Sequence, residues 1–99
     1  MAKRVASSRA TAESVGVAAL SFLADDSERF SRFVSLTGIG PEKIRAAAAE
    51  PGFLAGVLDH LMADESLLRT FAAERGFDPL EVVDARSVLT GPGWEREVP

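Results

Sequence analysis

Few side chains in this sequence could carry out chemistry. The chain has no cysteine and a single histidine, His60. His60 and Asp64 are four positions apart, so on one helix they would share a face, where an imidazole and a carboxylate can hold a metal ion together. However, Asp64 is also placed to cap a helix, and one histidine with one carboxylate is an incomplete ligand set. We therefore predict no metal site and no cofactor.

Catalysis by a nucleophile or by an acid–base pair has no better support. The serines stand in no context that pairs them with the histidine. The acidic group of Asp25, Asp26 and Glu28 has the composition of a helix start, where carboxylates accept hydrogen bonds from free backbone N–H groups. The absence of cysteine removes disulfides and thiolate nucleophiles together. We therefore expect no catalytic residue, and a protein that is not an enzyme.

One segment does have a motif with a defined ligand. Residues 36–44, Leu-Thr-Gly-Ile-Gly-Pro-Glu-Lys-Ile, resemble a helix-hairpin-helix element, whose Gly-apolar-Gly turn offers backbone N–H groups to a nucleic-acid phosphate. The resemblance implies phosphate contacts from Gly38, Gly40 and Lys43. Ile44 departs from the pattern, because that element usually has a small residue there so that its helices can cross closely.

The distribution of charge opposes a polyanionic partner. Formal net charge is −4, and residues 1–10 contribute +3, which leaves −7 on the rest of the chain. Around the Gly-Ile-Gly joint, residues 25–50 carry four basic and five acidic side chains, so no positive patch forms. A negative body repels phosphate backbones and anionic lipids and suits a basic protein partner. We therefore expect the partner to be another protein.

No feature of the sequence predicts a membrane or secreted protein. No apolar run approaches the roughly 20 residues that span a bilayer. The basic start and the moderately apolar residues 15–24 lack the uninterrupted core and the cleavage site of a signal peptide. We expect a cytoplasmic protein.

The elements that position these residues are all predicted to be helices, because apolar residues recur at helical spacing. Glycine and proline separate them: Gly38 and Gly76 suit the left-handed end of a helix, and Pro41 and Pro79 suit a first turn. The six expected segments are 11–24 with Thr11 as N-cap, 27–37, 41–49, one from Pro51, one between Asp64 and Gly76, and one from Pro79 to about Leu89.

Each segment has a predicted inner face. Val15, Ala19, Phe22 and Leu23 form that of the first helix. The remaining inward residues are Phe30, Phe33, Val34, Thr37, Ile44, Ala47, Leu54, Val57, Leu58, Leu61, Leu67, Leu68, Phe71, Val82, Val83, Ala85 and Leu89. Ile39 is expected to pack back on Val34 in a Schellman ending. Residues 1–10 are expected to be a flexible basic arm, 11–91 a single helical domain and 92–99 a flexible tail.

The two halves of the chain match at a constant offset of 38 positions. The matched pairs include Leu20/Leu58, Leu23/Leu61, Asp26/Asp64, Phe33/Phe71, Gly38/Gly76, Pro41/Pro79, Ile44/Val82, Ala47/Ala85 and the small residues Ala18/Gly56. Capping preferences alone would explain some of these pairs, but not a single offset shared by all. The predicted fold is an all-α compact bundle of about six helices, built from two pseudo-repeated, armadillo-like three-helix halves.

The core from Ala18 to Ala85 resembles a family of short bacterial proteins catalogued as domain of unknown function 3572. The resembling segments are Leu-Ala-Asp-Asp at 23–26, Arg-Phe-Val-Ser-Leu-Thr-Gly at 32–38, Phe-Leu at 53–54 and Val-Leu-Asp-His-Leu at 57–61. The resemblance implies a small all-helical fold in the bacterial cytoplasm and carries over no activity or site residue.

Two functions follow from these observations. The first is a non-catalytic protein–protein interaction or adaptor module that offers a groove between its halves or an acidic face. The alternative is weak, sequence-independent nucleic-acid binding through Gly38, Gly40 and Lys43.

Overall fold

The computed structural model describes residues 9–90 of the chain. Within that range the chain forms six α-helices and no strand, which confirms the all-α prediction. The helices are α1 (Arg9–Ala24), α2 (Ser27–Thr37), α3 (Pro41–Ala47), α4 (Pro51–Met62), α5 (Glu65–Arg75) and α6 (Pro79–Thr90). Most of the predicted arm and all of the predicted tail, residues 1–8 and 92–99, lie outside the described residues.

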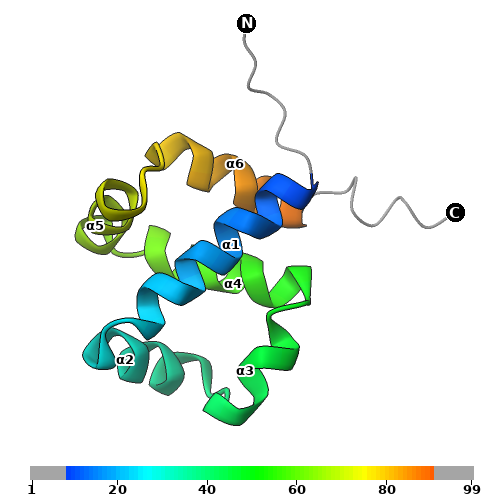
Figure 1. The fold of residues 1–99 in the computed structure, drawn as a ribbon, viewed down its shortest axis with the longest axis vertical. Coiled ribbons are helices and arrows are strands. Elements are labelled where there is room, and N and C mark those ends of the chain that lie inside the picture. Colours follow the sequence, from blue (N-terminus) through cyan, green and yellow to red (C-terminus); the bar gives the residue numbers. More distant parts are fainter. Residues whose placement is uncertain (1–8, 91–99) are drawn as a thin grey trace, which may run out of the picture.

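Two long helices, α1 and α4, cross at the centre of the molecule, and α6 packs against both (Figure 1). α2 and α5 lie toward one side, and α3 lies at the periphery below α4 in the same view. At the crossing, a β-carbon added to Gly16 would lie 2.9 Å from the Leu54 Cβ. A glycine is therefore needed for the two backbones to approach this closely.

The core is apolar and centres on this crossing. Its largest fully buried side chains are Phe22, Leu23, Phe33, Leu54, Val57, Leu58, Leu61, Phe71 and Val82. All of these were predicted to face inward. At about 25 cal/mol per Å² of apolar surface, side chains of this size each stabilise the fold by roughly 1.5–3 kcal/mol relative to exposure.

The predicted inner faces are wrong at several positions outside α1 and α4. In α2 only Phe33 is buried, while Phe30 and Val34 are half-buried and Thr37 is exposed. No residue of α3 is fully buried, although the predicted inward residue Ile44 is half-buried and packs against the core. In α6, Val83 is 40% exposed, because Val82, Ala85 and Leu89 already fill the face that meets α1 and α4.

Two helix boundaries differ from the prediction. α1 begins at Arg9, so Arg9 and Ala10 belong to the helix rather than to a flexible arm, and Thr11 lies inside it rather than at its cap. Arginine and alanine have high helix propensity, which favours this extension. α3 ends at Ala47 rather than at residue 49, because the Ala49 and Glu50 N–H groups donate to carbonyls three residues back, Ala46 O and Ala47 O, instead of continuing the four-residue pattern.

The predicted aspartate caps are confirmed. Asp26 Oδ1 accepts hydrogen bonds from the backbone N–H groups of Glu28 and Arg29, at 2.9 and 3.2 Å. Asp64 Oδ1 accepts one from the Leu67 N–H at 3.1 Å. Each cap stabilises its helix by about 1 kcal/mol relative to alanine at the same position. The caps therefore fix the first residues of α2 and α5.

The two Gly-to-Pro joints end their helices differently. Gly38 and Gly76 both have φ of 76°, the left-handed conformation. At the second joint the Gly76 and Phe77 N–H groups both donate to Ala72 O, and the Phe77 ring lies 5.4 Å from that of Phe71.

At the first joint the Gly38 N–H donates to Val34 O, but the Ile39 N–H contacts Thr37 Oγ1 at 3.4 Å. The Schellman ending predicted for Ile39 is therefore wrong. In a Schellman ending the Ile39 N–H would donate to a backbone carbonyl of α2. Here it donates to the Thr37 hydroxyl instead.

Candidate functional site

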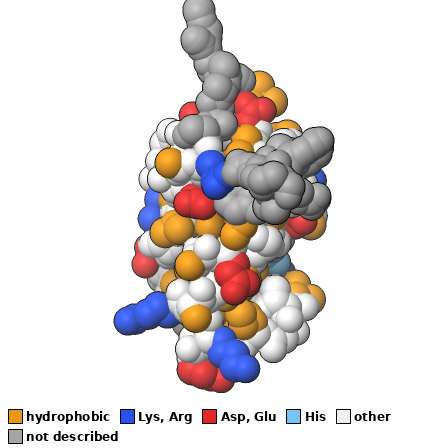
Figure 2. Space-filling model, turned by 90° about the vertical axis from the view of Figure 1, so that its right-hand side faces the viewer, with side chains coloured by type: hydrophobic (Ala, Val, Ile, Leu, Met, Phe, Trp, Pro, Cys, Tyr) orange, Lys and Arg blue, Asp and Glu red, His pale blue; other side chains and the backbone are white. Residues whose placement is uncertain are grey.

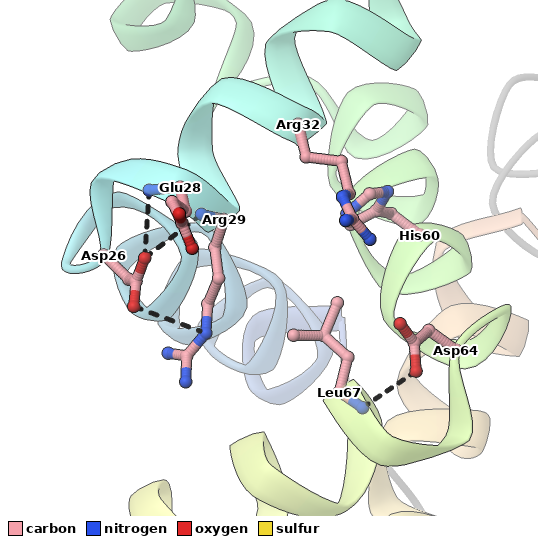
Figure 3. Close-up of a pocket in the computed structure, with 7 residues that line it drawn as sticks. All are labelled: Asp26, Glu28, Arg29, Arg32, His60, Asp64 and Leu67. Carbon is pink, nitrogen blue, oxygen red and sulfur yellow. Dashed lines mark hydrogen bonds and ion pairs between the residues drawn. The ribbon is translucent and has the colours of Figure 1, made fainter.

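A cleft opens where the start of α2 faces the junction of α4 and α5 (Figure 3). Its volume is about 230 Å³. The lining residues come from both halves of the chain and are Asp26, Glu28, Arg29, Arg32, His60, Asp64 and Leu67. Cationic, anionic and apolar groups thus meet in one concave surface of the described chain.

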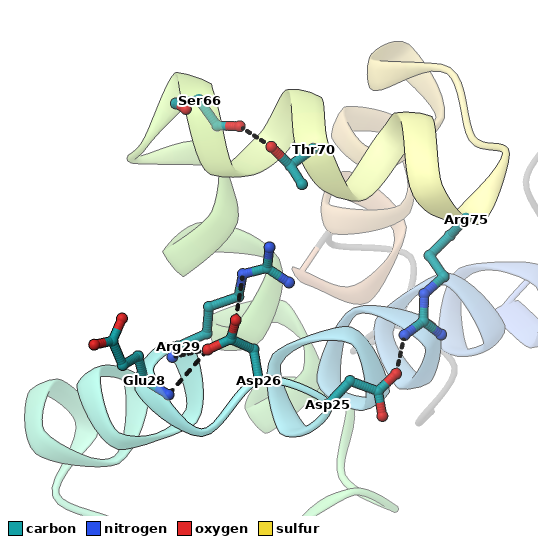
Figure 4. A network of polar contacts seen from close by, with 7 residues as sticks. All are labelled: Asp25, Asp26, Glu28, Arg29, Ser66, Thr70 and Arg75. Atoms are coloured by element: carbon teal, nitrogen blue, oxygen red, sulfur yellow. Dashed lines mark hydrogen bonds and ion pairs between the residues drawn. The ribbon is translucent and has the colours of Figure 1, made fainter.

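The α2 wall of the cleft is held in place by the Asp26 cap. Asp26 Oδ2 lies 4.0 Å from Arg29 Nε, in addition to the backbone bonds that Oδ1 accepts. The Arg29 guanidinium also lies over the Phe22 ring, 4.3 Å from its centroid. Figure 4 shows this group beside a second link, in which Arg75 of α5 donates to Asp25 Oδ2 at 2.6 Å. These contacts join the end of α1 to α2 and to α5.

The Arg32 side chain of α2 extends toward His60 of α4 (Figure 3), and its charge acts on the imidazole. The His60 ring packs edge-on against Phe33, with centroids 5.2 Å apart and an interplanar angle of 75°. Partial burial lowers the pKa of His60, the charge of Arg32 lowers it further, and the charge of Asp64 opposes both. The imidazole is therefore biased toward its neutral form beside an arginine.

Asp64, considered with His60 as a possible metal ligand, serves as a helix cap in the structure. Asp64 directs a carboxylate oxygen to the start of α5, where it caps the helix. Over residues 9–90, no group of three or more histidine, aspartate or glutamate side chains is arranged to hold a metal ion.

The candidate phosphate contacts lie at the first joint and outside the cleft. Gly40 is the N-cap of α3, with no side-chain cap, and Lys43 is exposed. A β-carbon at position 40 would lie 2.5 Å from Glu42 Oε2, so the Glu42 carboxylate already occupies the space beside this glycine. A phosphate approaching Gly40 would meet that negative charge.

Sequence reasoning noticed most of the cleft residues but did not bring them together. Asp26 and Asp64 were identified as caps, and Arg29 and Arg32 only as members of a mixed-charge segment. The sequence contains one usable signal, because Arg29 and Leu67 occupy matching positions three residues after the two aspartate caps. Nothing in the linear pattern shows that the two caps line one cleft.

No helix within residues 9–90 has the length and apolar character needed to cross a membrane. Neither the curated proteins nor the solved structures contain a significant match to this chain. One family, described as "Protein of unknown function (DUF3572)", matches residues 9–92, which is most of the chain. The matched segment spans all six helices and every residue of the cleft. The chain therefore belongs to the DUF3572 family.

Proposed function

We propose that this protein is a non-catalytic protein–protein interaction module that receives a segment of its partner in the cleft between α2 and the α4–α5 junction. The observation that carries the proposal is the composition of the cleft, with two arginines, three carboxylates, a histidine and a leucine in about 230 Å³. This volume suits one or two side chains of a peptide better than a large cofactor.

The state of the polar groups supports binding rather than chemistry. No polar or charged side chain is buried within the described part of the chain. The charges of the cleft are therefore exposed or half-exposed, and those of Glu28 and Arg32 are not engaged by the helix caps. Strong perturbation of reactive groups generally requires burial or a closely coupled partner. The acidic body and the absence of cysteine fit a cytoplasmic module with a basic partner.

We also infer that the chain is a duplication whose halves face one another across a pseudo-twofold axis. Two ring contacts support this inference. Phe22 of α1 meets Phe71 of α5 with centroids 5.3 Å apart, and His60 of α4 meets Phe33 of α2 at 5.2 Å. Adding 38 to position 22 gives 60, and subtracting 38 from position 71 gives 33.

Each residue of the Phe22–Phe71 contact therefore has its counterpart in the Phe33–His60 contact. A twofold axis that relates the two halves would place one contact on the other. Gly16 and Leu54, which are also 38 positions apart, touch at the α1–α4 crossing. On this inference the cleft is a product of the duplication, because it forms where the cap of one half approaches the cap of the other.

The proposal can be tested by site-specific photo-crosslinking in living bacterial cells that express the intact protein. A photoreactive amino acid replaces Glu28 at the cleft, and in a matched control it replaces Ser87, which is exposed on α6. We expect one discrete protein adduct from position 28 and none from position 87. The same adducts from both positions, or none from either, would contradict the proposal.

A further inference from the structure

We propose that the cleft binds a carboxylate group of the partner, held between the Arg32 guanidinium and the His60 imidazole. This inference rests on the proposed function and specifies the chemistry of the partner segment. The occupant is an acidic side chain, or a C-terminal carboxylate, in a peptide whose neighbouring residues are basic.

Arg32 forms no ion pair with a carboxylate of the described part of the chain. The other cleft arginine, Arg29, is engaged by Asp26 and by the Phe22 ring. The ion pairs of Arg69, Arg75 and Arg86 are made with Glu65, Asp25 and Asp59, none of which lines the cleft. Arg32 instead points toward His60 (Figure 3). A planar guanidinium with free donors is the group that best binds a carboxylate through two parallel hydrogen bonds.

His60 is held in position to assist. Its ring packs against the buried Phe33, and Phe33 also contacts Phe53 at 6.0 Å between centroids. The imidazole is therefore fixed by aromatic contacts rather than by a charged partner. An anion placed between Arg32 and His60 would relieve the unfavourable approach of two cationic groups when the histidine is protonated.

The rest of the cleft selects a monoanion with basic neighbours. Asp26, Glu28 and Arg29 at the start of α2 and Asp64 at the α4–α5 junction line the same cleft, and the charge of Asp64 acts on His60. With His60 neutral the lining carries one net negative charge, so a dianionic phosphate is repelled more strongly than a carboxylate. Glu28 and Asp64 at the rim are in turn suited to lysine or arginine side chains on either side of the bound carboxylate.

Binding and protonation of His60 are then coupled. A carboxylate beside the ring favours the imidazolium, so binding raises the pKa of His60, and by linkage the affinity rises as the pH falls. If binding raises the pKa of His60 by about 0.5, the protein with protonated His60 binds the carboxylate about threefold more tightly than the protein with neutral His60. Because His60 is the only histidine in the chain, its imidazole resonances can be assigned directly.

The experiment is an NMR titration of the full-length protein with acetyl-Lys-Glu-Lys-amide, with acetyl-Lys-Gln-Lys-amide as the neutral control. We expect the glutamate peptide to shift the His60 imidazole and to raise its titration midpoint, with a dissociation constant of about 1 mM or weaker for so short a ligand. The Arg32→Gln variant should bind about tenfold more weakly. Arg45→Gln, a matched change on the exposed face of α3, should bind as the wild type does.

The outcomes separate this inference from the proposed function. Equal shifts with the glutamine peptide, unchanged affinity in Arg32→Gln, or tighter binding of inorganic phosphate than of the glutamate peptide would each overturn the carboxylate site. If a cleft-specific crosslink forms while the peptide fails to bind, the interaction module stands and only the carboxylate assignment fails. If the peptide binds while no crosslink forms, the carboxylate site stands without a protein partner.

Discussion

The third helices of the two halves differ most. α6 is 12 residues long and buries Val82, Ala85 and Leu89 against α1 and α4, whereas α3 is 7 residues long and buries none. Figure 2 views the molecule from the side on which α3 lies and shows apolar side chains scattered among charged ones. The third helix of the second half therefore closes the core, whereas the third helix of the first half is an appendage.

The difference has a sequence cause. Pro51, which begins α4, interrupts the chain just where a third turn of α3 would continue, while α6 continues unbroken to Leu89. A link between α6 and α4 adds to the asymmetry, because the Arg86 guanidinium pairs with both carboxylate oxygens of Asp59. The comparison indicates that α6 completes the core formed by α1 and α4, whereas α3 contributes little to it.

The largest expected change in stability comes from substituting Ala85 of α6, compared with Ala47 at the corresponding position of α3. Ala85 is 1% exposed, whereas its counterpart Ala47 is half-buried. Ala85→Glu places a carboxylate in the apolar core, and we expect it to lower the free energy of unfolding by about 4 kcal/mol or more. Ala47→Glu should cost less than about 1 kcal/mol. Urea denaturation followed by circular dichroism measures both, and equal losses would show that the third helices are equivalent.

The next effect concerns the glycines of the two crossing helices. Gly16→Ala brings a β-carbon against Leu54, and we expect a loss of about 1–3 kcal/mol from overpacking. Gly56 has no atom within 4 Å of an added β-carbon, so Gly56→Ala should instead stabilise α4 by about 0.5–1 kcal/mol. Thermal unfolding checks the pair. A stabilising Gly16→Ala would refute the close crossing.

These glycines illustrate what could be predicted from the sequence. Helix number, the aspartate caps and the inner faces of α1 and α4 followed from spacing and capping chemistry, because those rules act over a few residues. The role of Gly16 did not follow, since it depends on Leu54 arriving from the other half of the chain. The cleft was missed for the same reason, because the approach of Arg32 to His60 is decided by tertiary packing.

A smaller effect is expected at the first joint. Gly40→Asp installs the residue that stands at the matching position of the second joint, where Asp78 Oδ1 accepts from the Leu80 N–H at 2.8 Å. Gly40 has φ of −75° and ψ of 147°, which any residue can adopt, and the Glu42 side chain can move aside. We expect a gain of a few tenths of a kcal/mol, about 0.3, in the free energy of unfolding.

The same variant tests the nucleic-acid alternative. Fluorescence anisotropy with short duplex and single-stranded DNA should show no salt-dependent binding by the wild type. Binding that weakens with added salt and is abolished by Gly40→Asp would instead assign phosphate contact to Gly38, Gly40 and Lys43.

The smallest expected effect is on the pH dependence of stability. It distinguishes the Phe33–His60 contact, which contains a titratable ring, from the Phe22–Phe71 contact, which does not. The pKa of His60 is lowered in the folded protein, so the folded chain binds fewer protons than the unfolded chain near the ordinary value of 6.5. The stability due to the neutral ring is complete above that value and is lost as the pH falls through the lowered pKa. His60→Phe, which copies Phe22, should lose less thermal stability than the wild type between about pH 7.5 and 5.5. An equal loss of thermal stability in the wild type and in His60→Phe would mean that His60 does not contribute to the pH dependence of stability.

Backbone hydrogen exchange tests most directly whether the second half closes the core while α3 stays an appendage. We predict the slowest exchange in the crossing helices α1 and α4 and along the buried face of α6. The amides of α3 should exchange at least about 100-fold faster, through a local opening that leaves the rest of the fold intact. Amides of α3 as strongly protected as those of α6 would contradict the account.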